Sequence, residues 1–296
     1  MALSDNARGA LLMNVAMIAF TLNDTAMKAV MQQVPMFQAM TLRGVLSTAA
    51  LVFLAWRMGA FAVAIAPRDR RFIGLRAVFE VASTLAFFAA LRNMPLANLS
   101  AIMQALPLVV TLVAALVLGE SVGWRRTLAI MAGFLGVLII IRPGAEGFSI
   151  WAGVGLLAML AVAVRDIVTR QMSRAIPSTF VAATASLAVL VTGLAGTAFE
   201  GWQPVALREA LLILFSAGML IVGYLTIVAA MRVGDIGVVA PYRYMALVWA
   251  ILLGWMIFGT LPDGLTLIGA GIVVASGIYT LLREAGLRRR RVQAAG

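Results

Sequence analysis

A carboxylate followed four residues later by a cation occurs twice in this chain, each time within an apolar stretch. The first pair is Asp24 with Lys28, and the second is Asp166 with Arg170, 142 residues further along. Charged side chains are costly in lipid and occur there mainly where they are paired or functional. Residues four apart share one helix face, so each pair can neutralise itself. Each is therefore either a structural ion pair or a gate with a proton-sensitive carboxylate.

Two further charged positions lie inside apolar stretches. Arg43 lies too deep to reach water easily, so we expect it to face the bundle interior. There it can bind a carboxylate substrate or pair with Asp24. Glu80 follows Arg76 by four residues and can pair with it near the membrane surface. Alternatively, Glu80 faces a central cavity, where a desolvated carboxylate suits a proton carrier.

The densest group of polar and aromatic residues is Pro241-Tyr242-Arg243-Tyr244. Pro241 can kink a helix and leave a backbone carbonyl without its helical donor. Arg243 can hold a carboxylate through two parallel hydrogen bonds. Tyr242 and Tyr244 point to different sides of a helix, so we expect at most one to face the same cavity as Arg243.

Gln104 lies 140 residues before Tyr244, close to the equivalent position of the first half. That relation predicts polar groups from both halves around one centre. Tyr224 can add an aromatic wall or serve as ordinary packing. The predicted substrate-binding residues are Gln104, Tyr242, Arg243, Tyr244, Tyr224 and Glu80. The predicted gating or coupling residues are Asp24, Lys28 and Arg43.

These residues lie in a chain with the composition of a membrane protein. Of its 296 residues, 63% are hydrophobic and 12% are charged, with a mean hydropathy of +1.02, far from the range of soluble domains. Ten segments can each cross the hydrocarbon core. They cover residues 9–30, 36–56, 72–91, 96–118, 126–142, 150–170, 178–198, 207–231, 236–258 and 264–283. Breaks rich in Pro, Gly or charge, such as 67–71, are expected to end helices at water.

Several classes of protein are excluded by what the sequence lacks. It has no His and no Cys, which removes thiolate or imidazole metal sites, disulfides and His-based catalytic dyads. We therefore expect no enzyme, catalytic residue, metal or cofactor. The net charge of +11 does not indicate nucleic-acid binding, because the arginines cluster in short segments between apolar runs.

Those arginines also predict the orientation. One set of helix ends and loops holds most of them, including the run Arg288–Arg291, which is expected to be a lipid-facing anchor. The positive-inside rule places this set, and both termini, in the cytoplasm. Five spans in each half then insert the second half upside down. We predict one polytopic domain over 1–296, with inverted repeats over 8–142 and 150–284, and a site near the midplane.

A family resemblance supports this architecture. The run Phe87–Ala97 and the later Leu118-Gly119-Glu120, together with Val239–Tyr244 in the second half, resemble the drug/metabolite transporter superfamily, EamA type. The resemblance implies ten helices in two inverted five-helix repeats and alternating access. Within it, the chain is similar to bacterial amino-acid exporters of the YddG kind. One departure is Gly259-Thr260, which replaces the second Gly-Glu and puts a paired glutamate role in doubt; Glu120 is then expected to be a structural cap.

Together these observations predict a multi-pass secondary transporter of the bacterial inner membrane. It would export small metabolites, above all aromatic or other neutral amino acids, by alternating access, with membrane lipid around it and protons as a candidate coupling ion. An alternative within the family is a carrier of a nucleotide-linked metabolite, S-adenosylmethionine or a cationic drug. A second alternative is a passive channel, which the lack of a recognisable filter sequence disfavours.

Overall fold

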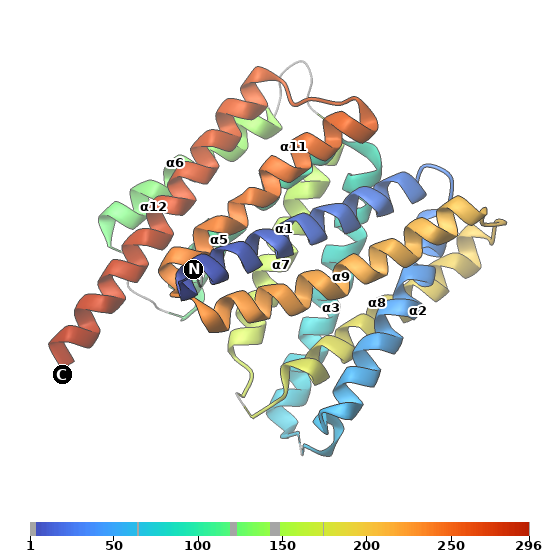
Figure 1. Cartoon of the computed structure of the whole chain (residues 1–296), viewed down its shortest axis with the longest axis horizontal. Coiled ribbons are helices and arrows are strands. Elements are labelled where there is room, and N and C mark those ends of the chain that lie inside the picture. The colour runs from blue at the N-terminus through green and yellow to red at the C-terminus, as the bar shows by residue number, and fades with distance from the viewer. Residues whose placement is uncertain (1–3, 64, 119–122, 143–148, 174, 296) are drawn as a thin grey trace. The chain divides into compact units, whose positions relative to one another are not determined.

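The structure is a computed structural model of the chain that describes residues 4–63, 65–118, 123–142, 149–173 and 175–295 (Figure 1). Every regular element within these residues is helical. The elements are α1 (Asp5–Val30), α2 (Met36–Arg57), η1 (Ala60–Ala62), α3 (Pro67–Asn93), α4 (Leu96–Met103), α5 (Leu106–Leu118), α6 (Trp124–Ile141), α7 (Ile150–Arg170), α8 (Ser178–Glu200), α9 (Leu207–Val233), α10 (Ile236–Val239), η2 (Ala240–Tyr244), α11 (Met245–Phe258) and α12 (Gly264–Ala295).

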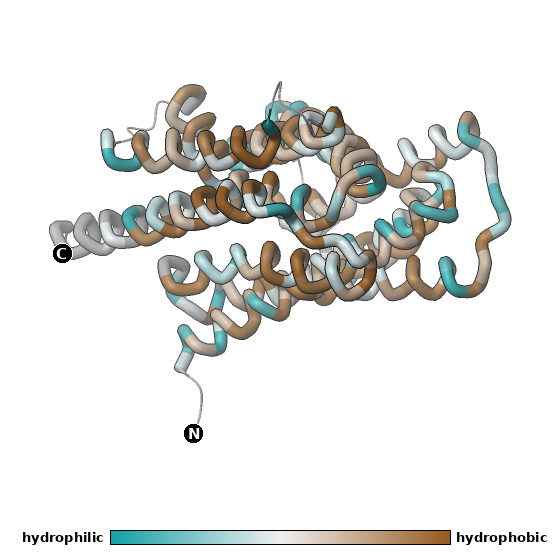
Figure 2. Tube along the Cα trace, turned by 90° about the horizontal axis from the view of Figure 1, so that it is seen from above, coloured by the Kyte–Doolittle hydropathy of each residue, from teal (hydrophilic) through white to brown (hydrophobic). Residues whose placement is uncertain are grey.

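Ten helical stretches among the described residues are long and apolar enough to cross a membrane. Figure 2 shows hydrophobic residues along these helices and hydrophilic ones mainly towards helix ends and loops. The predicted all-α membrane protein with ten spans is therefore confirmed. Gly119 and Glu120 of the family motif lie outside the described residues, and α12 continues past the predicted end at 283.

Several helix boundaries lie at the expected breakers. Pro35 and Pro177 immediately precede α2 and α8, where a residue without an N–H donor is tolerated. Gly201 ends α8 with φ of 88°, in the left-handed region that favours glycine. The predicted break over 67–71 is wrong, because Pro67 is the first residue of α3. Proline fits the first turn of a helix, where its missing donor has no partner to lose.

The fourth and ninth spans are interrupted near their prolines. In the fourth span, α4 stops before Gln104 and α5 starts at Leu106, with Pro107 in its first turn. The ring of Pro107 excludes a helical hydrogen bond to the residue four before it, which is the last of α4. In the ninth span, the four-residue α10 passes into the 3-10 helix η2, which contains Pro241, before α11 begins. The predicted kink at Pro241 is thus present as a break, and the fourth span is broken at Pro107 in a similar way.

The chain divides into two compact units. Unit 1 consists of Met1–Thr25, Met94–Ala152 and Met219–Gly296, and unit 2 consists of Ala26–Asn93 and Gly153–Gly218. The main helix pair of unit 2 is α2 with α8, and that of unit 1 is α6 with α12 (Figure 1). The members of these pairs begin 142 and 140 residues apart, which are the offsets of the sequence repeat. Each unit therefore joins matching helices from the two halves.

Both pairs pack closely through glycines. A Cβ on Gly136 of α6 would lie 2.7 Å from the carbonyl oxygen of Gly269 on α12. On α8, a Cβ on Gly193 would lie 2.8 Å from Oγ1 of Thr41 on α2. Small residues allow such close approach where lipid gives helices no hydrophobic reason to associate. Each of the two helix pairs is thus stabilised by close backbone contact as well as by side-chain packing.

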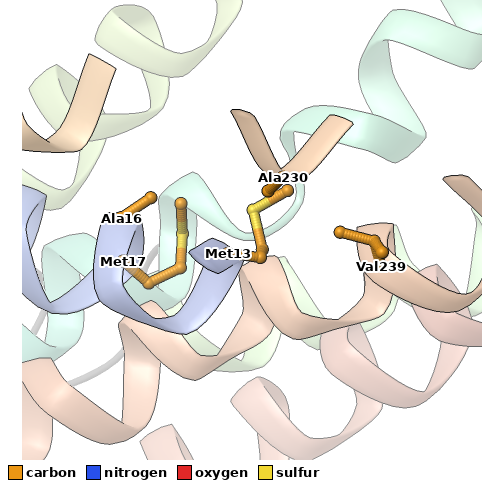
Figure 3. Close-up of a cluster of buried hydrophobic side chains, with 5 residues drawn as sticks. All are labelled: Met13, Ala16, Met17, Ala230 and Val239. Atoms are coloured by element: carbon orange, nitrogen blue, oxygen red, sulfur yellow. The ribbon is translucent and has the colours of Figure 1, made fainter. Parts of the chain in front are cut away.

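The core of unit 1 is rich in methionine. Met13, Ala16 and Met17 of α1 are buried against Ala230 of α9 and Val239 of α10 (Figure 3). Unbranched thioether side chains fill irregular gaps between helices. Val239 is the last residue before η2, so this cluster packs against the chain where the ninth span is broken.

Candidate functional site

The two helix breaks of unit 1 meet at Gln104. This residue follows the last turn of α4, and its Nε2 donates to the backbone carbonyl oxygens of Arg243 at 3.5 Å and Tyr244 at 3.4 Å. Both bonds are at the long end of the normal range. The structure therefore brings together the polar groups of the two halves that the sequence had placed at equivalent positions.

The three polar residues of η2 face different surroundings. Tyr242 is 41% exposed and Arg243 is also exposed, whereas Tyr244 is only 5% exposed. Successive residues of a 3-10 helix are separated by a third of a turn, which sends neighbouring side chains in different directions. Tyr242 and Arg243 are thus the accessible pair at this break, and the expected divergence of the two tyrosines is observed.

Tyr244 packs against α12. A Cβ placed on Gly277 would lie 1.7 Å from the Tyr244 hydroxyl oxygen, so only glycine leaves room for the ring. The hydroxyl is buried and has no hydrogen-bond partner among the residues that the structure describes. Its surroundings therefore fit helix packing better than the predicted contact with a substrate.

Tyr224 and Asp24 also belong to unit 1, on other helices. The Tyr224 ring on α9 meets the Phe20 ring of α1 edge-on, with centroids 5.7 Å apart and planes at 86°. Tyr224 remains 45% exposed, so part of its side chain is accessible. Asp24 Oδ1 accepts a hydrogen bond from Asn23 Nδ2 at 2.9 Å.

Lys28 belongs to the last turns of α1, in unit 2, and its side chain contacts the C-terminal end of α3. The side chain is 8% exposed, and its Nζ donates to the carbonyl oxygen of Leu91 at 2.7 Å. Gln32 Nε2 donates to the carbonyl oxygen of Arg92 at 3.3 Å. Both carbonyls belong to the last turn of α3, where a cation and a donor stabilise otherwise unpaired groups. This arrangement favours the structural interpretation of Lys28.

Arg43 in unit 2 stacks on an aromatic ring. Its Cζ lies 4.8 Å from the centroid of Phe88, a ring that is 2% exposed. A guanidinium over a ring face is attracted by the ring quadrupole, which stabilises the charge away from water. Arg43 is therefore accommodated within unit 2 by α3.

Glu80 belongs to a network of four charges between α3 and α7. Its Oε2 lies 3.3 Å from Arg76 Nη2, and its Oε1 lies 3.2 Å from Arg165 Nη1. Arg165 Nη2 lies 2.8 Å from Asp166 Oδ1, and Arg76 Nε donates to Thr169 Oγ1 at 3.1 Å. The predicted Arg76–Glu80 pair is present. Arg165 is the residue that the sequence alone did not select, although its place beside Asp166 in an apolar helix was a signal.

The predicted residues thus fall into two groups. Gln104, Tyr242, Arg243, Tyr244, Tyr224 and Asp24 belong to unit 1, and Glu80, Lys28 and Arg43 belong to unit 2. Of these, Gln104 and η2 form a cluster across the sequence repeat. Their roles in binding or gating remain predictions.

Comparison with known proteins extends this picture. Residues 7–142 and 149–282 each match the EamA-like transporter family. The S-adenosylmethionine uptake transporter of Rickettsia conorii is 29% identical over 206 residues, which span 67% of each chain. The riboflavin transporter of Rhizobium johnstonii is 29% identical over 73% of this chain and 71% of its own. The pseudopaline exporter CntI of Pseudomonas aeruginosa is 26% identical over 91% of this chain and 94% of its own.

A solved structure agrees in fold. It has a TM-score of 0.62 and 21% sequence identity, and the match covers 93% of this chain and 96% of that one. At this identity the likeness concerns the path of the helices. The described helices and these matches together establish a multi-pass membrane transporter.

Proposed function

Because the chain belongs to the EamA-like transporter family, we propose that it is a carrier for small metabolites that combine a carboxylate with an aromatic ring. S-adenosylmethionine, which has both groups, is the leading candidate substrate. A relative that is 29% identical is an uptake transporter for this compound, and that similarity supports the choice.

The observation that carries the proposal is the accessible pair Tyr242 and Arg243 at a helix break. A guanidinium can bind a carboxylate through two parallel hydrogen bonds, and a tyrosine ring offers a face for stacking. Gln104 bonds the backbone of Arg243 and Tyr244, so its role is to position the break. The site would thus bind the carboxylate of a substrate at Arg243 and its aromatic ring at Tyr242.

A second candidate is outward transport of aromatic amino acids, as the sequence predicted. These compounds also pair a carboxylate with a ring, so the same two side chains favour them. The relatives include both an uptake transporter and an exporter, and direction would follow the gradients of substrate and coupling ion. The protein would lie in a bacterial inner membrane with cytoplasmic termini, with Asp24 and Glu80 as proton-coupling candidates.

Liposomes containing the purified protein test the proposal. Labelled S-adenosylmethionine, tryptophan and riboflavin are presented outside vesicles that are empty or preloaded with unlabelled compound, with and without a pH gradient. A carrier is expected to show faster uptake into preloaded vesicles, whereas a channel is not. A flux that ignores the pH gradient would remove the coupling role of Asp24 and Glu80.

The matched variants are Arg243→Ala and Arg232→Ala, both exposed arginines of unit 1. Loss of a charged hydrogen bond costs about 1.5–3 kcal/mol, or roughly 10- to 150-fold. We expect this loss for S-adenosylmethionine and tryptophan with Arg243→Ala, and little change with Arg232→Ala. Riboflavin has no carboxylate, so any riboflavin flux should be unaffected. Equal flux of the two carboxylates in wild type and Arg243→Ala would contradict the proposed clamp.

A further inference from the structure

The paired helices α6 and α12 of unit 1 leave an open groove between them, with a volume of about 640 Å³. This volume lies within the range of about 300–1,000 Å³ that is typical of small-molecule sites. Small and apolar side chains line its length, among them Ala129, Ala132 and Ala275. The groove can therefore take a hydrocarbon chain but offers few polar partners along its length.

One end of the groove has a different chemistry. Trp124 and Arg125 at the start of α6 and Tyr279 on α12 line this end. The Arg125 Cζ lies 5.1 Å from the centroid of the Trp124 ring, which is 68% exposed, and Tyr279 is 44% exposed. Trp and Tyr are the residues enriched at the level of lipid headgroups.

The same end is also basic. Among the described residues, no carboxylate forms an ion pair with Arg125. Arg283 follows Tyr279 by one turn of α12, and the sequence continues with Arg288–Arg291. The groove therefore has a positive end and an apolar length. It is complementary to a molecule with an anionic head and a hydrocarbon tail.

We propose that this groove is a binding site for an anionic phospholipid. The phosphate would lie at Arg125 beside the rings of Trp124 and Tyr279, and one acyl chain would run along Ala129, Ala132 and Ala275. Neither Gln104 nor any residue of η2 lines this groove, and the proposal does not depend on which substrate the protein carries.

Native mass spectrometry of the full-length protein tests the site, with phosphatidylglycerol or phosphatidylcholine added to detergent micelles. Each basic residue near an anionic lipid contributes about 1 kcal/mol, or about fivefold. Arg125→Gln is expected to weaken phosphatidylglycerol binding about fivefold and to weaken phosphatidylcholine binding by a smaller factor, because the choline cation of that lipid offsets its phosphate charge. The control is Arg57→Gln, because Arg57 also follows an exposed tryptophan, Trp56, at a helix end; it should change neither lipid.

The apolar part is tested by filling the groove. Ala275 is exposed on α12, so Ala275→Leu projects into the groove without entering the helix contact, and it should reduce retention of both lipids. Ala195→Leu, at an exposed alanine of α8, should have no such effect. Equal losses from Arg125→Gln and Arg57→Gln would overturn the proposal, because attraction would then be non-specific. Unchanged lipid binding in Ala275→Leu would also overturn the proposal. So would a protein dimer that only Ala275→Leu disrupts, because the groove would then be occupied by a second copy of the chain.

Discussion

Single charged side chains at helix ends account for several of the polar groups in this apolar chain. Lys28 donates to the last turn of α3, and Asp263 lies immediately before α12, where its Oδ1 accepts a hydrogen bond from the Thr266 amide at 2.7 Å. Arg142, which ends α6 with a left-handed φ of 51°, forms an ion pair with Asp263. The α6 and α12 ends are thereby connected by charge as well as by packing.

Asp263 should make stability depend on pH. The hydrogen bond from Thr266 and the contact with Arg142 favour the ionised carboxylate, so they hold the pKa of Asp263 below its ordinary value. A lowered pKa in the folded state stabilises the protein above the ordinary aspartate pKa of about 3.9, and this contribution is lost as the pH falls through the lowered pKa. In a thermal unfolding series towards low pH, the Tm of wild type should exceed that of Asp263→Asn at neutral pH, and this difference should disappear as the pH falls.

Asparagine keeps a side-chain oxygen for the Thr266 amide, so the variant isolates the effect of charge from that of capping. Asp263 is 55% exposed at the side chain, and solvent screening makes the expected shift small. A constant difference in Tm between wild type and Asp263→Asn across the acidic range would contradict this account.

At the scale of elements, α2 and α8 approach each other closely at a glycine of α8. A Cβ on Gly196 would lie 2.1 Å from the Phe37 ring, and overpacking of this kind costs about 1–3 kcal/mol. We therefore expect Gly196→Ala to lower Tm in detergent. Gly74 on α3 has no heavy atom within 4 Å of an added Cβ, so Gly74→Ala should raise Tm slightly through its better helix propensity. Similar changes in Tm for Gly196→Ala and Gly74→Ala would mean that close packing of α2 on α8 does not contribute to stability as proposed.

The sequence predicted the helices well because hydropathy and breakers act locally. The break at η2 followed from Pro241, and the place of Gln104 beside it followed from the repeat offset. The burial of Tyr244 did not follow, because it depends on Gly277 of a helix that begins after α11. The link between Glu80 and Arg165 also needed the packing of α3 against α7, which no local pattern encodes.

At the scale of the whole molecule, both units combine segments from both halves of the sequence. Separate expression of residues 1–142 or 149–296 should give unstable products, because each lacks one helix of both the α2–α8 and the α6–α12 pair. Co-expression of the two fragments should restore a complex that a tag on one fragment purifies intact. A single fragment that elutes as one species with its own cooperative unfolding transition would contradict this expectation.

The α2–α8 contact is also asymmetric between the two halves of the chain. If one ancestral five-helix protein associated with an inverted copy of itself, every substitution at this contact changed both sides at once. Once the copies were joined, each side could diverge alone. Gly193 and Gly196 on α8 correspond, at the offset of 142, to Leu51 and Leu54 on α2. The tight backbone approach to Thr41 and Phe37 is thus present at one of the two repeat-related contacts and not at the other.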